Sequence, residues 1–103
     1  MDIKERILDT IDYLLNNIEE IEKDKETEEE IKESLLEVVN QKDNERLRPS
    51  FYDEKVDIKI LKPVDLLTIL KDNIVAGHIR SKTRLEHIEN MVGEIRLFLD
   101  SKE

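Results

Sequence analysis

The chain has 103 residues, which allows one domain with a small hydrophobic core. Its net charge of −9 disfavours nonspecific binding to DNA or anionic membranes, because phosphates repel it, and the absence of cysteine excludes disulfides and thiolate metal sites. Residues 1–50 hold 16 acidic and 8 basic side chains, whereas residues 51–103 hold 10 and 9. The acidic N-terminal half therefore suits a basic protein surface.

The N-terminus lacks the basic start and apolar run of a signal peptide, and apolar runs elsewhere are only a few residues long. We therefore predict a soluble, cytoplasmic protein without a membrane-spanning helix. Charged residues make up 42% of the chain, against roughly 25% in an average globular protein. This composition favours helices with heavily charged outer faces.

A first helix is predicted over residues 3–23, with Asp2 as its N-cap. Leu8 and Leu15 widen its apolar stripe beyond a coiled-coil seam, which indicates a helix that packs against two neighbours in a bundle. The stripe steps by threes and fours through Ile7, Ile11, Leu14, Ile18 and Ile21.

The apolar periodicity does not continue through residues 24–27, where we predict a turn. Thr27 followed by Glu30 has the spacing of a capping box and predicts the start of a second helix that runs to Asn40. The two helices would form an acidic antiparallel hairpin over residues 1–42. The alternative is one long helix with an acidic, solvated middle.

Residues 43–62 are predicted to be an irregular connector, because Pro49 discourages a helix there. Residues 56–60 alternate apolar and polar side chains, which predicts either a short strand or an extended loop. Phe51 and Tyr52 either pack across the open end of the bundle or anchor a partner, since exposed loop aromatics are typical of interfaces.

A second helical pair is predicted over residues 63–100. Pro63 is well placed as the first residue of a helix, and Gly77 is well placed to end it in the left-handed conformation. Eight of the thirteen residues between 64 and 76 are apolar, which predicts the most buried helix.

Thr83 and Glu86 predict a capping box for the last helix, which runs to Asp100. Gly93 inside it is either a tolerated surface glycine or a point of close approach by another helix. Met91 and Phe98 widen its apolar stripe, which contains Leu85, Ile88, Val92, Ile95 and Leu99. The sequence thus predicts an all-α, single-domain protein over residues 1–103: a four-helix antiparallel bundle with a long connector between its second and third helices.

Eight of the twelve residues from Glu19 to Glu30 are acidic. This run is either a solvated hairpin tip or a negative surface that competes with nucleic acid for a basic site. The functional hypothesis is a small non-enzymatic interaction module, an inhibitor or adaptor of phage or mobile-element origin, that binds a basic protein partner through Glu28, Glu29 and Glu30. The two wide apolar stripes must be covered, and a second copy of the chain could cover part of them. We therefore also expect a homodimer.

The alternative hypothesis concerns the basic turn at residues 78–87, which precedes and opens the last helix. Arg80, Lys82, Arg84 and His87 there would bind a phosphate or nucleic acid near the helix N-terminus. The spacing of Arg80 and His87 also resembles that of some all-helical ribonucleases.

Carboxylate pairs three residues apart, such as Glu30 with Glu33 and Glu54 with Asp57, suggest Mg²⁺ ligands. Such spacing arises by chance in a chain with 26 acidic residues, and the second pair lies in the predicted connector. We therefore predict no metal, no cofactor and no enzymatic activity.

Overall fold

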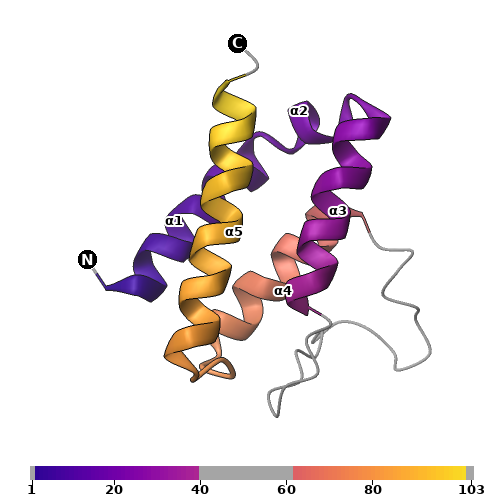
Figure 1. The fold of residues 1–103 in the computed structure, drawn as a ribbon. Helices are drawn as coiled ribbons and strands as arrows, with labels where there is room; N and C mark the ends of the chain where they lie inside the picture. The colour runs from indigo at the N-terminus through magenta and orange to yellow at the C-terminus, as the bar shows by residue number, and fades with distance from the viewer. Residues whose placement is uncertain (1, 40–61, 102–103) are drawn as a thin grey trace, which may run out of the picture.

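A computed structural model describes residues 2–39 and 62–101, and every regular element within these ranges is an α-helix. The helices are α1 (Ile3–Asn16), α2 (Ile18–Glu22), α3 (Lys25–Val39), α4 (Pro63–Val75) and α5 (Lys82–Asp100) (Figure 1). The predicted all-α class is confirmed, with five helices described where four were expected. The connector predicted at 43–62 and its possible strand at 56–60 lie outside the described residues, apart from Lys62.

The helix predicted for residues 3–23 is broken at Asn17. The backbone of Asn17 has φ −113° and ψ 24°, away from α-helical values, and its side-chain Nδ2 donates to the Tyr13 carbonyl at 2.8 Å. Asparagine side chains compete for nearby backbone groups in this way and so interrupt helices. The break lets α2 leave the line of α1 while Ile21 remains fully buried (Figure 1).

The chain turns at Lys23 and Asp24, which excludes the alternative of one long helix through the acidic region. Helix α3 begins at Lys25, so the capping box predicted at Thr27 is wrong. Thr27 is buried within the first turn and its Oγ1 donates to Asp24 Oδ2 at 2.9 Å. The Asp24 carbonyl accepts the Glu28 N–H at 2.9 Å, the first bond of the helix.

Both ends of α4 follow the sequence prediction. Pro63 is its first residue, and Gly77 beyond its end has a positive φ of 76°. The Gly77 N–H donates to the Ile74 carbonyl at 3.1 Å, and the His78 N–H donates to the Asn73 carbonyl at 3.0 Å. These two bonds are the pair of a Schellman motif, which satisfies carbonyls at the helix end.

Helix α5 begins at Lys82, one residue before its predicted cap at Thr83. Ser81 caps it instead, because the Ser81 Oγ accepts the Arg84 N–H at 3.3 Å. Gly93 lies within α5, and a Cβ added there would meet no atom within 4 Å. Among the described residues, no helix therefore packs closely on this glycine, and the close-approach interpretation is wrong.

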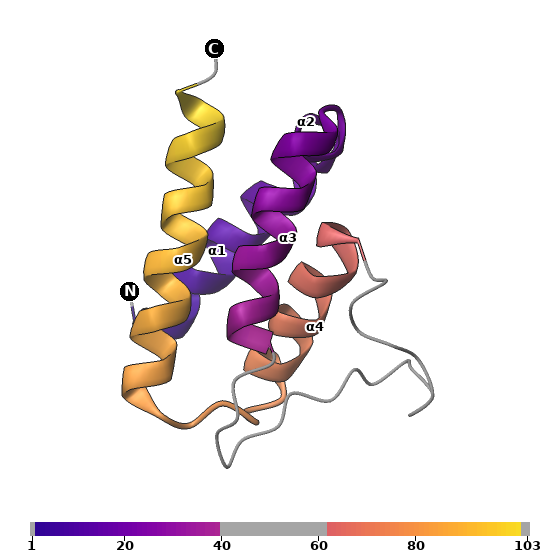
Figure 2. The ribbon, with the colours of Figure 1, turned by 45° about the vertical axis from the view of Figure 1, so that its right-hand side comes forward.

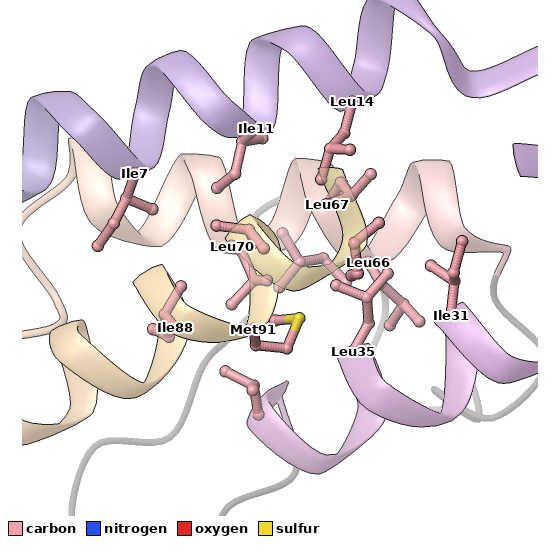
Figure 3. Close-up of a cluster of buried hydrophobic side chains, with 14 of the residues drawn as sticks. Ile7, Ile11, Leu14, Ile31, Leu35, Leu66, Leu67, Leu70, Ile88 and Met91 are labelled. Atoms are coloured by element: carbon pink, nitrogen blue, oxygen red, sulfur yellow. The ribbon is translucent and has the colours of Figure 1, made fainter. Parts of the chain in front are cut away.

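The hydrophobic core gathers around α4, as the sequence predicts. Leu66, Leu67 and Leu70 have no exposed surface, and Figure 3 shows them between side chains of α1, α3 and α5. Both terminal stripes enter this core within one chain. Their buried members are Ile7, Ile11, Leu14 and Ile21 from the first stripe, and Leu85, Ile88, Val92, Ile95 and Leu99 from the second.

Helices α1 and α5 run in the same general sense. Arg6 Nε lies 2.7 Å from Glu89 Oε2, and the Tyr13 hydroxyl donates to Asp100 Oδ1 at 2.6 Å, so residue numbers rise together along both helices. The hydrogen bond to Glu89 raises the pKa of Arg6. The Arg96 guanidinium lies 4.2 Å from the centroid of the Tyr13 ring. This pairing differs from an antiparallel bundle, in which the first and last helices run oppositely.

Figures 1 and 2 show α3 and α5 side by side with α1 behind them, and Figure 2 shows α4 on the other side of α3 from α5. The boundary between these two helices, α3 and α5, which we call the α3–α5 seam, contains the buried side chains of Ile31 on α3 and of Met91 and Ile95 on α5.

Candidate partner-binding site

Helix α3 divides its residues between an apolar inner side and an acidic outer side. Ile31, Leu35 and Val38 are buried. The outer side carries exposed carboxylates at intervals of four, three and four residues, which we call the carboxylate ridge: Glu26, Glu30, Glu33 and Glu37. This spacing keeps side chains on one side of a helix, and at 1.5 Å per residue the ridge is about 16 Å long.

The structure separates the three glutamates that the sequence singled out. Glu29 and Glu30 are exposed, whereas Glu28 is half-buried. Only Glu30 belongs to the carboxylate ridge. Glu28 lies in the first turn of α3, where the helix dipole stabilises a carboxylate.

An open hollow of about 150 Å³, the α3–α5 groove, lies beside Glu30. Its lining comes from α3 and α5: Glu30, Ile31, Ser34, Met91, Glu94, Ile95 and Phe98. Ile31, Met91 and Ile95 expose less than a tenth of their surface and form the apolar floor, whereas Phe98 is 38% exposed. Figure 3 shows Met91 reaching from α5 towards Leu35 on α3.

The rim of the α3–α5 groove is negative on both sides. Glu30 from α3 and Glu94 from α5 are both exposed and line the hollow. The polar group of Ser34 is already satisfied, since its Oγ donates to the Glu30 carbonyl at 3.2 Å. The groove thus combines an apolar floor with carboxylates on either side, an arrangement that favours an apolar group flanked by positive charge.

The basic turn is only partly available at the surface. Arg80, Lys82 and His87 are exposed, but Arg84 is 3% exposed. The Arg84 Nη2 donates to the Val38 carbonyl at 3.3 Å. This contact places a cation at the C-terminal end of α3, where the helix dipole favours it. Arg84 is therefore positioned as a structural residue that ties α5 to α3.

Sequence reasoning missed part of the groove. Met91 and Phe98 are recognisable in the sequence as widening the apolar stripe of the last helix, but nothing marks them as site residues. Ser34 and Glu94 carry no local signal, because only the pairing of α3 with α5 brings them together. Phe51 and Tyr52, predicted as partner contacts, lie outside the described residues.

Within residues 2–39 and 62–101, no three histidine, aspartate or glutamate side chains come together to hold a metal ion. In the same ranges, no helix has the length and apolar character needed to cross a membrane. Comparisons with family models, with curated proteins and with solved structures find no match to this chain. The candidate site therefore rests on its own geometry.

Proposed function

We propose that the protein is a non-enzymatic interaction module that binds a basic surface of another protein through the acidic outer side of α3. The carboxylate ridge is the observation that carries this proposal. The inner side of α3 supplies the core contacts, so the ridge is free of a packing role. Four carboxylates in a row create a negative potential that attracts and orients a positively charged partner.

Such a module acts as an inhibitor where the basic surface is the partner's own nucleic-acid site, and as an adaptor elsewhere. A row of carboxylates competes with phosphates for the same lysine and arginine side chains, because both form charge-assisted hydrogen bonds with them. The small size of the groove also fits a binding module, since clefts that enclose a small-molecule ligand are typically about 300 Å³ or larger.

Selection from a random peptide library tests this proposal whatever the identity of the natural partner. The wild-type protein is expected to enrich peptides rich in lysine and arginine. A variant that combines Glu30→Lys, Glu33→Lys and Glu37→Lys, three exposed members of the carboxylate ridge, should lose that enrichment while its circular dichroism spectrum stays helical. Binding of a selected peptide should weaken as salt concentration rises, because screening reduces attraction between exposed charges.

The matched control combines Glu5→Lys, Asp9→Lys and Glu86→Lys, which changes the net charge equally at exposed positions outside α3. This control should keep the enrichment. If no basic peptides are enriched, or if the α3 variant still selects them, the acidic side of α3 is not a partner surface.

A further inference from the structure

We propose that the α3–α5 groove receives one apolar side chain from a lysine- or arginine-rich α-helix of the partner protein. This inference rests on the proposed function and names the chemistry of the partner at the same site. The groove is a hollow of about 150 Å³ beside the carboxylate ridge. An apolar cavity of about that volume accommodates a group the size of a benzene ring. One leucine, methionine or phenylalanine side chain therefore matches it.

The negative charge of the groove rim determines which partner residues can flank that apolar side chain. Glu30 and Glu94 stand on opposite sides of the hollow, and both are exposed. An apolar anchor without neighbouring cations would leave these carboxylates facing an uncharged partner. A lysine or arginine on each side of the anchor would pair with them at the rim, while the anchor is withdrawn from water against Ile31, Met91 and Ile95.

The spacing of the carboxylate ridge favours a helical partner over an extended one. Its carboxylates follow one another at steps of four, three and four residues, about 5.5 Å apart on average along the helix axis. Cations at the same steps on a partner helix would repeat at the same distance, whereas alternate residues of a strand are spaced at about 6.6 Å. An amphipathic helix laid along a groove between two helices is also a common mode of peptide recognition.

A second copy of this chain is a poor occupant of the groove. Two grooves brought together would place Glu30 and Glu94 of one copy against the same carboxylates of the other. The resulting like-charge repulsion opposes that arrangement. Charge complementarity thus selects a basic partner.

The test uses a fluorescein-labelled synthetic helix of about five turns, built from lysine, alanine and glutamine with one central leucine. Anisotropy titrations compare this peptide with a version whose leucine is replaced by alanine. The leucine peptide should bind wild-type protein about tenfold more tightly, since burying a leucine side chain contributes enough for such a change. Backbone amide shifts in the NMR spectrum should concentrate at the groove-lining residues.

Ser34→Leu fills the hollow and removes only a hydroxyl bonded within its own helix, so the fold should persist. This variant should abolish the tenfold preference for the leucine peptide while charge-driven binding remains. Leu97→Ala is the matched control, because Leu97 is 69% exposed and does not line the groove; it should keep the preference.

The outcomes separate the two proposals. If both peptides bind equally well, or if Ser34→Leu leaves the preference intact, the groove assignment is overturned while an acidic binding surface stands. If neither lysine peptide binds at low salt, the proposed function fails and the groove assignment fails with it. Concentration-dependent dimerisation that shifts the same groove amides would also overturn it, because a second copy would then be the occupant.

Discussion

The buried guanidinium of Arg84 donates to the backbone carbonyl of Val38 at 3.3 Å, and so joins the first turn of α5 to the last turn of α3. These residues are far apart in the sequence, yet their bond fixes one end of the seam that contains the α3–α5 groove. The sequence places Arg84 in a predicted nucleic-acid site. In the structure, Arg84 instead connects the two helices that form the α3–α5 groove.

Arg84→Ala should destabilise the protein by about 2–3 kcal/mol, because it leaves the Val38 carbonyl without this donor and opens a cavity. Urea denaturation followed by circular dichroism measures the change. Lys82→Ala, an exposed change in the same turn, should alter stability by less than about 0.5 kcal/mol. Equal effects of the two substitutions would show that the Arg84 contact contributes little.

Burial of Arg84 also weakens the nucleic-acid hypothesis. Of the four residues proposed for that site, only Arg80, Lys82 and His87 are exposed. We expect no saturable binding of a labelled single-stranded RNA at physiological salt, as judged by fluorescence anisotropy. Tight binding that falls steeply with salt and is lost in Arg80→Ala would restore the phosphate-binding alternative. RNA cleavage that is lost in His87→Ala would restore the ribonuclease alternative.

The two glycines should respond oppositely to alanine. Gly93→Ala should stabilise the protein by about 1 kcal/mol, because alanine is the better helix former and its Cβ meets no neighbour. Gly77→Ala should destabilise it by about 1 kcal/mol or more, because φ is 76° there. Thermal and urea unfolding measure both. A destabilising Gly93→Ala would indicate a close contact at that position.

Tyr13 links α1 to α5 through two different contacts. Tyr13→Phe should lower stability by about 1 kcal/mol by removing the hydrogen bond to Asp100, while the ring still faces Arg96. Tyr13→Leu should cost more, since it also removes the cation–π contact. A double-mutant cycle that combines Tyr13→Phe with Asp100→Ala isolates the hydrogen bond, because alanine has no side-chain acceptor. A coupling energy near zero would mean that the two groups do not interact in solution.

Burial within one chain removes the main reason to expect a homodimer. Both apolar stripes enter a single core, and the large apolar side chains left exposed among the described residues are Val75, Leu97 and Phe98. We therefore expect a monomer at micromolar concentration in sedimentation velocity. A dimer that dissociates in Leu97→Ala would instead indicate self-association through the outer side of α5.

Several features of the fold can be predicted from the sequence because they depend on neighbouring residues. The stripes mark which faces must be buried, Pro63 begins a helix because its fixed φ suits that position, and Gly77 ends the helix because it tolerates positive φ. The abundance of glutamate between residues 26 and 37 likewise identifies an acidic surface from the sequence alone.

The tertiary structure decided how those faces meet. The shared sense of α1 and α5 replaces the expected antiparallel arrangement of the first and last helices, and the burial of Arg84 depends on the end of α3 lying close by. An apolar stripe specifies that a helix must be covered, but it does not specify by which helix, because hydrophobic burial is non-directional. The sequence marks Glu30 and the apolar stripe that contains Ile95, but it does not show that α3 and α5 pack together, and only that packing creates the α3–α5 groove.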